Sequence, residues 1–341
     1  MDGEPGSITP ATGAPTRPRL RSLDVLRGIA VVGMVFVNER GIDAAHPALL
    51  RHPDWVGFTL ADTVFPLFLF CIGVSMAFAR PKGWPEVLRR CAVLFAIGVA
   101  LSFIGQGRLV FAGVLQHIAI TSLLATVVLR FPRRGQVAAV VAILVGCGAV
   151  GVLGGFAVRD TWNVAANQWL YGRDTAEGVL VIVCSVANVV GGAWVGSLVR
   201  AAEPRVVCRR MVVVAAGCVA VALALAPWIP VIKREWTPTY ALVGFASSCL
   251  FLAAVMWWTD VRGRSRGSGW LMELGANPLA VYVAVTAAAD LVPDGVRDSV
   301  AEWAAALVGA ATASLLWSLG WVLVAVALAK VLWRRGVIVK L

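Results

Sequence analysis

Residues 177–199 read EGVLVIVCSVANVVGGAWVGSLV, and this segment decides the fold class. After Glu177 it contains no charged side chain. A helix needs about 20 apolar residues to cross the hydrocarbon core of a bilayer. Lipid offers no hydrogen bonds to the backbone, so a spanning segment has to satisfy its own backbone groups, as a helix does. The segment therefore predicts a transmembrane α-helix.

Similar apolar segments recur on both sides of this one. The chain has 341 residues, of which 59% are hydrophobic and only 14% charged, with a mean hydropathy of +0.81. Soluble domains are about 45–50% apolar and about 25% charged. We expect an all-α polytopic bundle of about ten transmembrane helices in one domain, residues 20–341, after a disordered cytoplasmic tail, residues 1–19. The expected spans are 23–38, 56–79, 88–105, 110–129, 136–157, 177–199, 211–229, 238–258, 270–292 and 303–333, the last of them long enough to tilt or extend beyond the bilayer.

The formal net charge of +11 comes from basic residues in short loops. Counted by alternating loops, 21 of the Lys and Arg residues lie on one side and 8 on the other. Cytoplasmic loops carry the excess of basic residues. This asymmetry predicts a cell (inner) membrane protein with both termini in the cytoplasm. The loops near 39–55, 158–176, 230–237 and 292–302 then face outward.

Two other classes of protein are disfavoured by the pattern. No basic amphipathic helix or basic patch interleaved with aromatic residues is present, so nucleic acid is not an expected partner. The seven cysteines lie in or beside apolar segments without any CxxC pair, and no HExxH or HxxxH spacing occurs, so no metal site is expected. We read the cysteines as small apolar packing residues.

The polar residues within apolar segments are the candidates for function, because burying them in lipid is costly. Asp24 and Arg27 are three residues apart, on one face of the first span. Their plain interpretation is an ion pair that locks neighbouring helices. Gln116, Glu177 and Asn277 are further candidates for structural or substrate-lining roles, and each could equally be an ordinary interhelical hydrogen-bond partner.

The densest set of polar residues surrounds the first outward loop. Asn38 ends the first span, His52 lies in the loop, and the sequence TLAD at residues 59–62 forms a capping-box pattern at the start of the second span. Asp62 could serve only as that cap, and a histidine in a loop is by default a solvated surface group. All three residues nevertheless belong to one helix–loop–helix at one membrane face. A carboxylate beside an imidazole fixes its tautomer and raises its basicity, which suits deprotonating a hydroxyl or an amine.

These segments resemble the heparan-α-glucosaminide N-acetyltransferase family. The resemblance is carried by SLDVLRGIAVVGMVFVN at 22–38 and HPDWVGFTLADTVFPLFLFCIGVS at 52–75. Shorter matches are GVLQ at 113–116, EG at 177–178 and GANPLAVY at 275–282. Two features depart from the family: His117 stands where an arginine is frequent, and the outward loops are much shorter than in the lysosomal enzyme.

The resemblance implies a transmembrane acyltransferase that moves an acetyl or other short acyl group from cytosolic acyl-CoA to a sugar or glycosylated molecule near the outer face. The family's essential histidine falls on His52, and its neighbouring asparagine and aspartate fall on Asn38 and Asp62. His52 would act as general base or carry the acyl group transiently, Asp62 would orient it, and Asn38 would donate a hydrogen bond to the thioester carbonyl.

The donor needs a basic binding site because its nucleotide part is anionic. Candidates in the cytoplasmic loops are Arg89, Arg90, Arg130, Arg133 and Arg134. The expected partners are acyl-CoA, such as acetyl-CoA, a sugar-containing acceptor and the lipid bilayer, with a homo-oligomer as a further possibility. The main alternative is a carrier or flippase without covalent chemistry, although no discontinuous-helix pair or inverted repeat is evident from the sequence.

Overall fold

The computed structural model describes residues 20–80, 82–264 and 267–339. The expected tail at residues 1–19 lies outside the described residues. Thirteen α-helices form the described part: α1 (Arg21–Asn38), α2 (Val64–Phe78), α3 (Trp84–Gln106), α4 (Val114–Leu129), α5 (Arg133–Gly154), α6 (Trp162–Tyr171), α7 (Val179–Ala201), α8 (Pro204–Leu225), α9 (Pro238–Met256), α10 (Gly269–Ala276), α11 (Pro278–Asp290), α12 (Asp294–Val308) and α13 (Ala310–Arg334). Short 3₁₀ turns precede α2 at Asp43–Ala45, Ala48–Leu50 and Leu60–Thr63, and a π turn, Trp257–Val261, extends α9.

The helices are those of a multi-pass membrane protein. Seven of those described are long and apolar enough to cross a bilayer, and the bent pair of α10 and α11 raises this to at most eight. Ten spans are therefore not confirmed. Two expected spans fall short for identifiable reasons: α1 carries Arg21, Asp24 and Arg27 within its 18 residues, and α4 has only 16 residues.

Two expected spans are broken. The segment 270–292 is not one helix, because α10 and α11 meet at an angle of 84° around Asn277 and Pro278. The residue before a proline is biased away from helical backbone, which accounts for the break. The segment 303–333 is also divided, between α12 and α13, at Gly309 with φ +84°. The structure thus contains a discontinuous helix pair that the sequence did not reveal.

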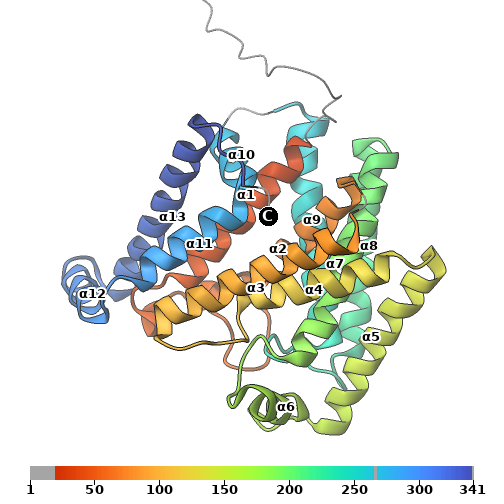
Figure 1. The fold of residues 1–341 in the computed structure, drawn as a ribbon, viewed down its shortest axis with the longest axis horizontal. Coiled ribbons are helices and arrows are strands. Elements are labelled where there is room, and N and C mark those ends of the chain that lie inside the picture. The colour runs from red at the N-terminus through yellow and green to blue at the C-terminus, as the bar shows by residue number, and fades with distance from the viewer. Residues whose placement is uncertain (1–19, 81, 265–266, 340–341) are drawn as a thin grey trace, which may run out of the picture.

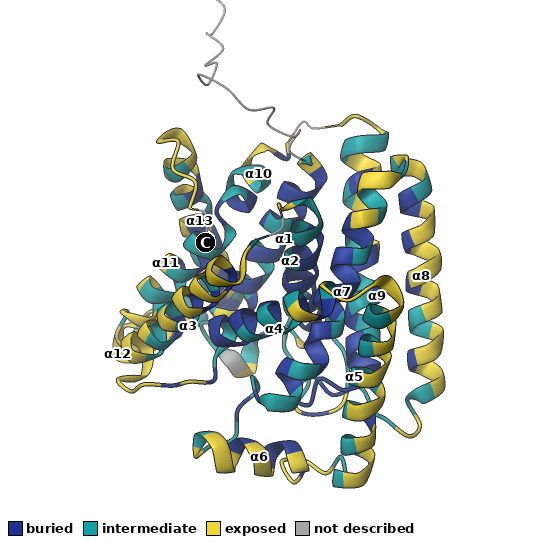
Figure 2. Ribbon diagram, turned by 45° about the vertical axis from the view of Figure 1, so that its right-hand side comes forward, coloured by how far each residue is buried: buried dark blue, intermediate teal, exposed yellow. Residues whose placement is uncertain are grey.

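The core of the bundle is the contact between α2 and α7, which are buried while α3, α5 and α8 expose much of their surface (Figure 2). Glycines allow this contact. A Cβ on Gly73 of α2 would lie 1.9 Å from the Val189 carbonyl oxygen, and one on Gly192 of α7 would lie 2.4 Å from the Phe70 carbonyl oxygen. Membrane helices commonly approach closely over such small residues.

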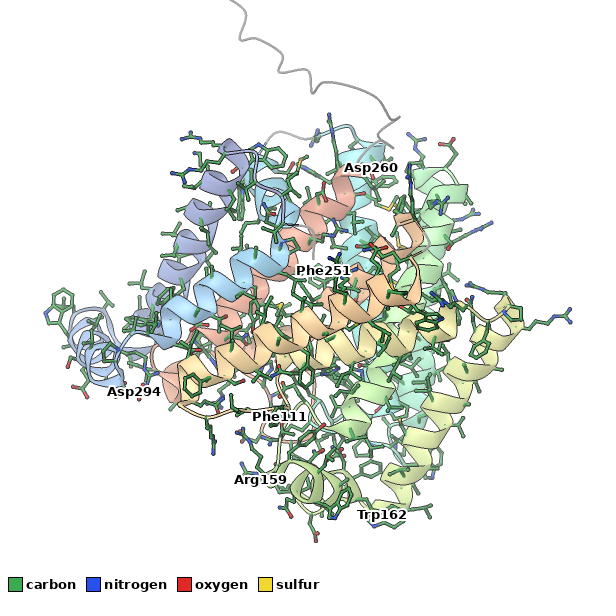
Figure 3. The ribbon with its side chains drawn as sticks, in the orientation of Figure 1. Phe111, Arg159, Trp162, Phe251, Asp260 and Asp294 are labelled. Carbon is green, nitrogen blue, oxygen red and sulfur yellow. The ribbon has the colours of Figure 1, made fainter. Side chains whose placement is uncertain are left out.

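Three of the four loops that were expected to share one face lie together, those near 39–55, 158–176 and 230–237. The Gly57 amide donates to the Val231 carbonyl at 2.9 Å, and the Trp55 indole donates to the Phe156 carbonyl at 2.9 Å. Figure 1 shows α6 at this end of the molecule, away from α10 at the other end. Arg159 and Trp162 mark the same end in Figure 3, opposite Asp260. We call it the outer end, following the distribution of basic residues.

Candidate active site

The capping residues before α2 position the first member of the site. The expected capping box is present. One carboxylate oxygen of Asp62, Oδ2, accepts from the Thr59 amide at 2.9 Å and lies 3.1 Å from the Thr59 hydroxyl. The Tyr240 hydroxyl of α9 donates to the Asp62 carbonyl at 2.9 Å, which ties this turn to the bundle. The Asp62 side chain is fully buried and held on two sides.

The other oxygen of Asp62 faces His52. Its Oδ1 lies 2.7 Å from His52 Nδ1, so Asp62 both caps the helix and pairs with the imidazole. An ionised carboxylate only accepts hydrogen bonds, and the proton of the neutral ring is therefore assigned to Nδ1. Nε2 is left with its lone pair, the arrangement that a general base requires. The His52 side chain is 27% exposed, so a substrate can reach the ring.

A third member of the site comes from a segment 181 residues further along the chain. Lys233 Nζ lies 2.8 Å from His52 Nε2, 3.2 Å from Nδ1 and 4.0 Å from Asp62 Oδ1. Lys233 belongs to a turn in which the Trp236 amide donates to the Lys233 carbonyl at 2.9 Å. Trp236 adopts φ +44°, a conformation rare for a bulky residue, and its indole donates to Asn188 Oδ1 at 3.1 Å. The buried indole thereby fixes the turn that presents Lys233.

Sequence reasoning missed Lys233 as a site residue. The available signal is that it is the single lysine in the outer loops, where the other basic residues are arginines. Lysine, unlike arginine, readily loses its proton when buried. Burial lowers the pKa of Lys233 to about 8, although the charges of Asp62 and Glu177 oppose the shift.

The neighbours of His52 act on its charge in opposite directions. Burial lowers the pKa of His52, the hydrogen bond to Asp62 raises it, and the ammonium group of Lys233 lowers it again. The net pKa lies below the ordinary value of 6.5. These surroundings favour the neutral ring, which is the form that can accept a proton.

Asn38 lies elsewhere at the outer end. Its amide nitrogen is 3.4 Å from the Tyr282 hydroxyl of α11, and its side chain is exposed. It lines a cavity of about 350 Å³ together with Glu39 and Asp290. The structure thus brings His52 and Asp62 together and places Asn38 beside Tyr282.

The other two histidines have buried environments. His46, which shares the loop with His52, is buried with Nδ1 3.0 Å from the Ser314 hydroxyl. His117 is buried with Nε2 2.8 Å from the Ser185 hydroxyl, and its ring packs edge-on against Phe65. Both rings lie within the protein packing, in contrast to the accessible ring of His52.

Three of the remaining candidates lie toward the opposite end. Arg27 pairs with Asp24 at 3.0 Å and also donates to Ser75 of α2, so the pair links α1 to its neighbour. Asn277 bonds through its amide to the Val337 carbonyl at 2.9 Å and the Val339 amide at 2.7 Å. Asp24, Arg27 and Asn277 therefore hold helices and the C-terminal segment together.

Gln116 and Glu177 line one common cavity of about 410 Å³ at the outer end. Gln116 Nε2 donates to the Val110 carbonyl at 2.9 Å. The Thr175 hydroxyl lies 3.4 Å from Glu177 Oε2. Packing therefore brings together two residues that are far apart in the sequence.

The basic residues proposed for the donor lie in the first turns of α3 and at the junction of α4 and α5. The Arg130 guanidinium stacks 3.7 Å from the centre of the Trp84 ring and donates to the Lys82 carbonyl at 2.9 Å. The Arg133 guanidinium lies 4.2 Å from the centre of the Trp194 ring. Arg89 and Arg134 are exposed, and Arg90 is half-buried. Within the described residues, no group of three His, Cys, Asp or Glu side chains could hold a metal ion.

Comparison with known proteins matches the part of the chain that contains His52 and Asp62. Residues 19–171 match the sequence model of the catalytic region of heparan-alpha-glucosaminide N-acetyltransferase. The resemblance to this family is thereby confirmed. The human protein of that name is 45% identical over 73 residues, which are 21% of this chain and 11% of the relative. The mouse protein is 32% identical over 129 residues, which are 33% of this chain and 19% of the relative.

The match to heparan-alpha-glucosaminide N-acetyltransferase covers only part of this chain and part of each relative. The aligned segments span less than a fifth of the length of either relative. Asn38, His52 and Asp62 lie inside residues 19–171, whereas Lys233 lies outside that match. Lys233 therefore comes from a part of the chain outside the matched residues. Its place beside His52 is known only from the structure.

Proposed function

We propose that the protein is a transmembrane acyltransferase that moves an acetyl or other short acyl group from acyl-CoA to a hydroxyl or amine of a sugar-like acceptor at the outer end. The observation that carries this proposal is the 2.7 Å contact of His52 with the buried Asp62, on an accessible ring. The family resemblance supplies the reaction class.

His52 Nε2 takes the proton of the acceptor as its oxygen or nitrogen attacks the thioester carbonyl carbon. The new acyl–oxygen or acyl–nitrogen bond forms, the carbon–sulfur bond breaks, and His52 returns the proton to the departing thiolate to give free CoA. Asp62 keeps the ring in the required tautomer and stabilises the imidazolium that forms in between. Asn38 is the proposed hydrogen-bond donor to the thioester oxygen, and its exposed amide would have to leave Tyr282.

The Lys233 side chain has to move away from the His52 ring before this step. Its Nζ lies 2.8 Å from the nitrogen that would accept the proton. The charge of Glu177 also attracts the ammonium. We infer that the arriving acceptor displaces Lys233 from the ring toward this carboxylate.

His52→Ala tests the proposal directly. General-base catalysis contributes about 10²–10⁴-fold, so CoA release from acetyl-CoA by the purified protein should fall by that order with a wide set of sugar and amine acceptors. Leu49→Ala, an exposed change in the same loop, is the matched control and should retain activity. His46→Ala is unsuitable as a control because His46 is buried against Ser314. Turnover of His52→Ala at the wild-type rate would refute the assignment.

The bent pair α10–α11 favours a second candidate, a carrier, because transporters build binding sites from discontinuous helices. The break, however, lies near the start of α1, where a Cβ on Gly275 would meet the Asp24 carbonyl oxygen at 1.8 Å. Asn277 at the break is occupied by the segment after α13. The side chain of Asn277 at the break is therefore already bonded within the protein and is not available to a substrate.

A further inference from the structure

The amine of Lys233 lies where the proposed acceptor would have to react. Its Nζ is 2.8 Å from Nε2 of His52 and 3.2 Å from Nδ1. Because these distances are similar, Nζ lies between the two ring nitrogens, and a small rotation of the flexible lysine side chain would bring an N–H onto the lone pair of Nε2. The side chains of Lys233 and His52 are 25% and 27% exposed, so a third group can approach both. A primary amine thus already lies beside the proposed general base.

The surroundings of Lys233 favour an amine that can act as a nucleophile. Burial lowers the pKa of Lys233 to about 8, against the opposing charges of Asp62 and Glu177, so about half of the amines are neutral at that pH. The other cations that act on Lys233 are Arg40 and Arg234, whose guanidinium groups do not lose their protons in proteins. Of these three cations, only Lys233 can offer a free lone pair to an acyl group.

We propose that Lys233 is a self-acylation site, at which the protein transfers the acyl group of acyl-CoA to its own Nζ when no acceptor is bound. The proposal rests on the proposed acyltransferase function and adds a modification of the protein itself. The neutral Nζ attacks the thioester carbonyl carbon, a nitrogen–carbon bond forms, and the carbon–sulfur bond breaks. His52 Nε2 takes the proton that the attack makes acidic and gives it to the departing thiolate. The products are an amide on Lys233 and free CoA.

The modification would change the site in two ways. An amide carries no charge, so the attraction of Glu177 for the Lys233 ammonium is lost. The acylated side chain is also larger, and nothing then draws it away from the His52 ring. We therefore expect the modified protein to acylate external acceptors more slowly. An acceptor that displaces Lys233 should protect the protein from the modification.

The test is peptide mapping by mass spectrometry of the purified full chain, after incubation at pH 8 with acetyl-CoA that carries a deuterated acetyl group and without an acceptor. The deuterium distinguishes this reaction from acetylation in the cell. Lys233 should take up the label at least about tenfold faster than Lys82, before α3, and Lys330, in α13, which report uncatalysed acetylation. In His52→Ala, labelling of Lys233 should fall toward the rate of those two lysines.

Two further variants serve as controls. Arg159→Lys places an exposed amine at the same end of the molecule, outside the contact of Lys233 with His52, and this amine should take up the label at the uncatalysed rate. Lys233→Arg keeps the positive charge beside His52 but supplies no nucleophile. CoA release in the absence of an acceptor should therefore fall in Lys233→Arg.

The outcomes separate this proposal from the acyltransferase proposal when CoA release with external sugars and amines is measured in parallel. Labelling of wild-type Lys233 at the rate of Lys82 and Lys330, or at an unchanged rate in His52→Ala, would overturn self-acylation. Turnover of an external acceptor without labelling of Lys233 would overturn self-acylation alone. Labelling of Lys233 that requires His52, without transfer to any external acceptor, would support self-acylation and count against the proposed acceptor. The absence of both reactions would refute both proposals.

Discussion

At the scale of single residues, the site consists of a locally encoded pair and a distant third group. Asp62 is used twice, with one oxygen on the helix cap and the other on His52. This dual use explains why a carboxylate can be fully buried here: both oxygens have partners, which offsets the cost of burial. Asn in its place would present an amide donor to one of these two partners.

The charge of Lys233 should control the pH dependence of activity. A cation beside the ring disfavours the imidazolium, so Lys233 lowers the pKa of His52. The proposed general-base role needs the neutral ring, so activity should be lost as pH falls through the His52 pKa. Lys233→Met removes the cation and raises this pKa, so the acid limb of the kcat/KM profile should move to higher pH.

Arg159→Met is the matched control for this prediction, because it removes a positive charge from an exposed position at the same end. It should leave the acid limb in place. A purely structural role of Lys233 would lower the rate at every pH without moving the limb. An acid limb that stays at the wild-type position in Lys233→Met would contradict the prediction.

At the scale of elements, glycines decide how closely the helices approach. Gly73→Val places a side chain against the backbone of α7, since even a Cβ would lie 1.9 Å from the Val189 oxygen. Overpacking of a tight core costs about 1–3 kcal/mol, and more where backbone has to move. We expect a lower melting temperature in detergent or loss of the monodisperse peak on size exclusion.

Gly217→Val is the control for the packing prediction. Gly217 lies within α8, and nothing is within 4 Å of its Cβ position. The two substitutions share the same helix-propensity cost, so the difference between them reports packing alone. Equal melting temperatures of the two variants would show that the α2–α7 contact is looser than the structure indicates.

At the scale of the whole molecule, the distribution of basic residues predicts the orientation in the membrane. An impermeant thiol reagent added to intact cells should label Leu49→Cys and spare Gly83→Cys. Both positions are exposed, so accessibility to the reagent depends on the membrane face. Wild-type protein, whose cysteines lie within the described helices, sets the background. Labelling of position 83 without position 49 would reverse the orientation.

We expect donor binding at the opposite end in this orientation. Arg89→Ala and Arg134→Ala remove exposed guanidinium groups that no stacked tryptophan holds in place. They should raise the KM for acetyl-CoA and leave the acceptor KM nearly unchanged, because the two substrates meet different faces. Arg159→Ala at the outer end is the control. An unchanged donor KM in both variants would move the CoA site elsewhere.

The sequence alone determined several features that depend on local order. Hydropathy identified the helices of a membrane protein, the alternation of basic residues grouped the outer loops, and the TLAD pattern predicted the cap at Asp62. The pairing of His52 with Asp62 also belongs here, because only ten residues separate them. Each of these features is set by neighbours along the chain, which a local pattern can encode.

Only the tertiary structure decided the rest. Lys233 is 181 residues from His52, and the cavity combines α3, the start of α4, the segment before α7 and α11. The break at Asn277 and the division at Gly309 were likewise hidden, since the apolar pattern runs through both. Contacts between distant segments depend on how closely whole helices pack. Glycines such as Gly98 and Gly105 allow a close approach because they have no side chain. No pattern along the chain records which partner will fill that space.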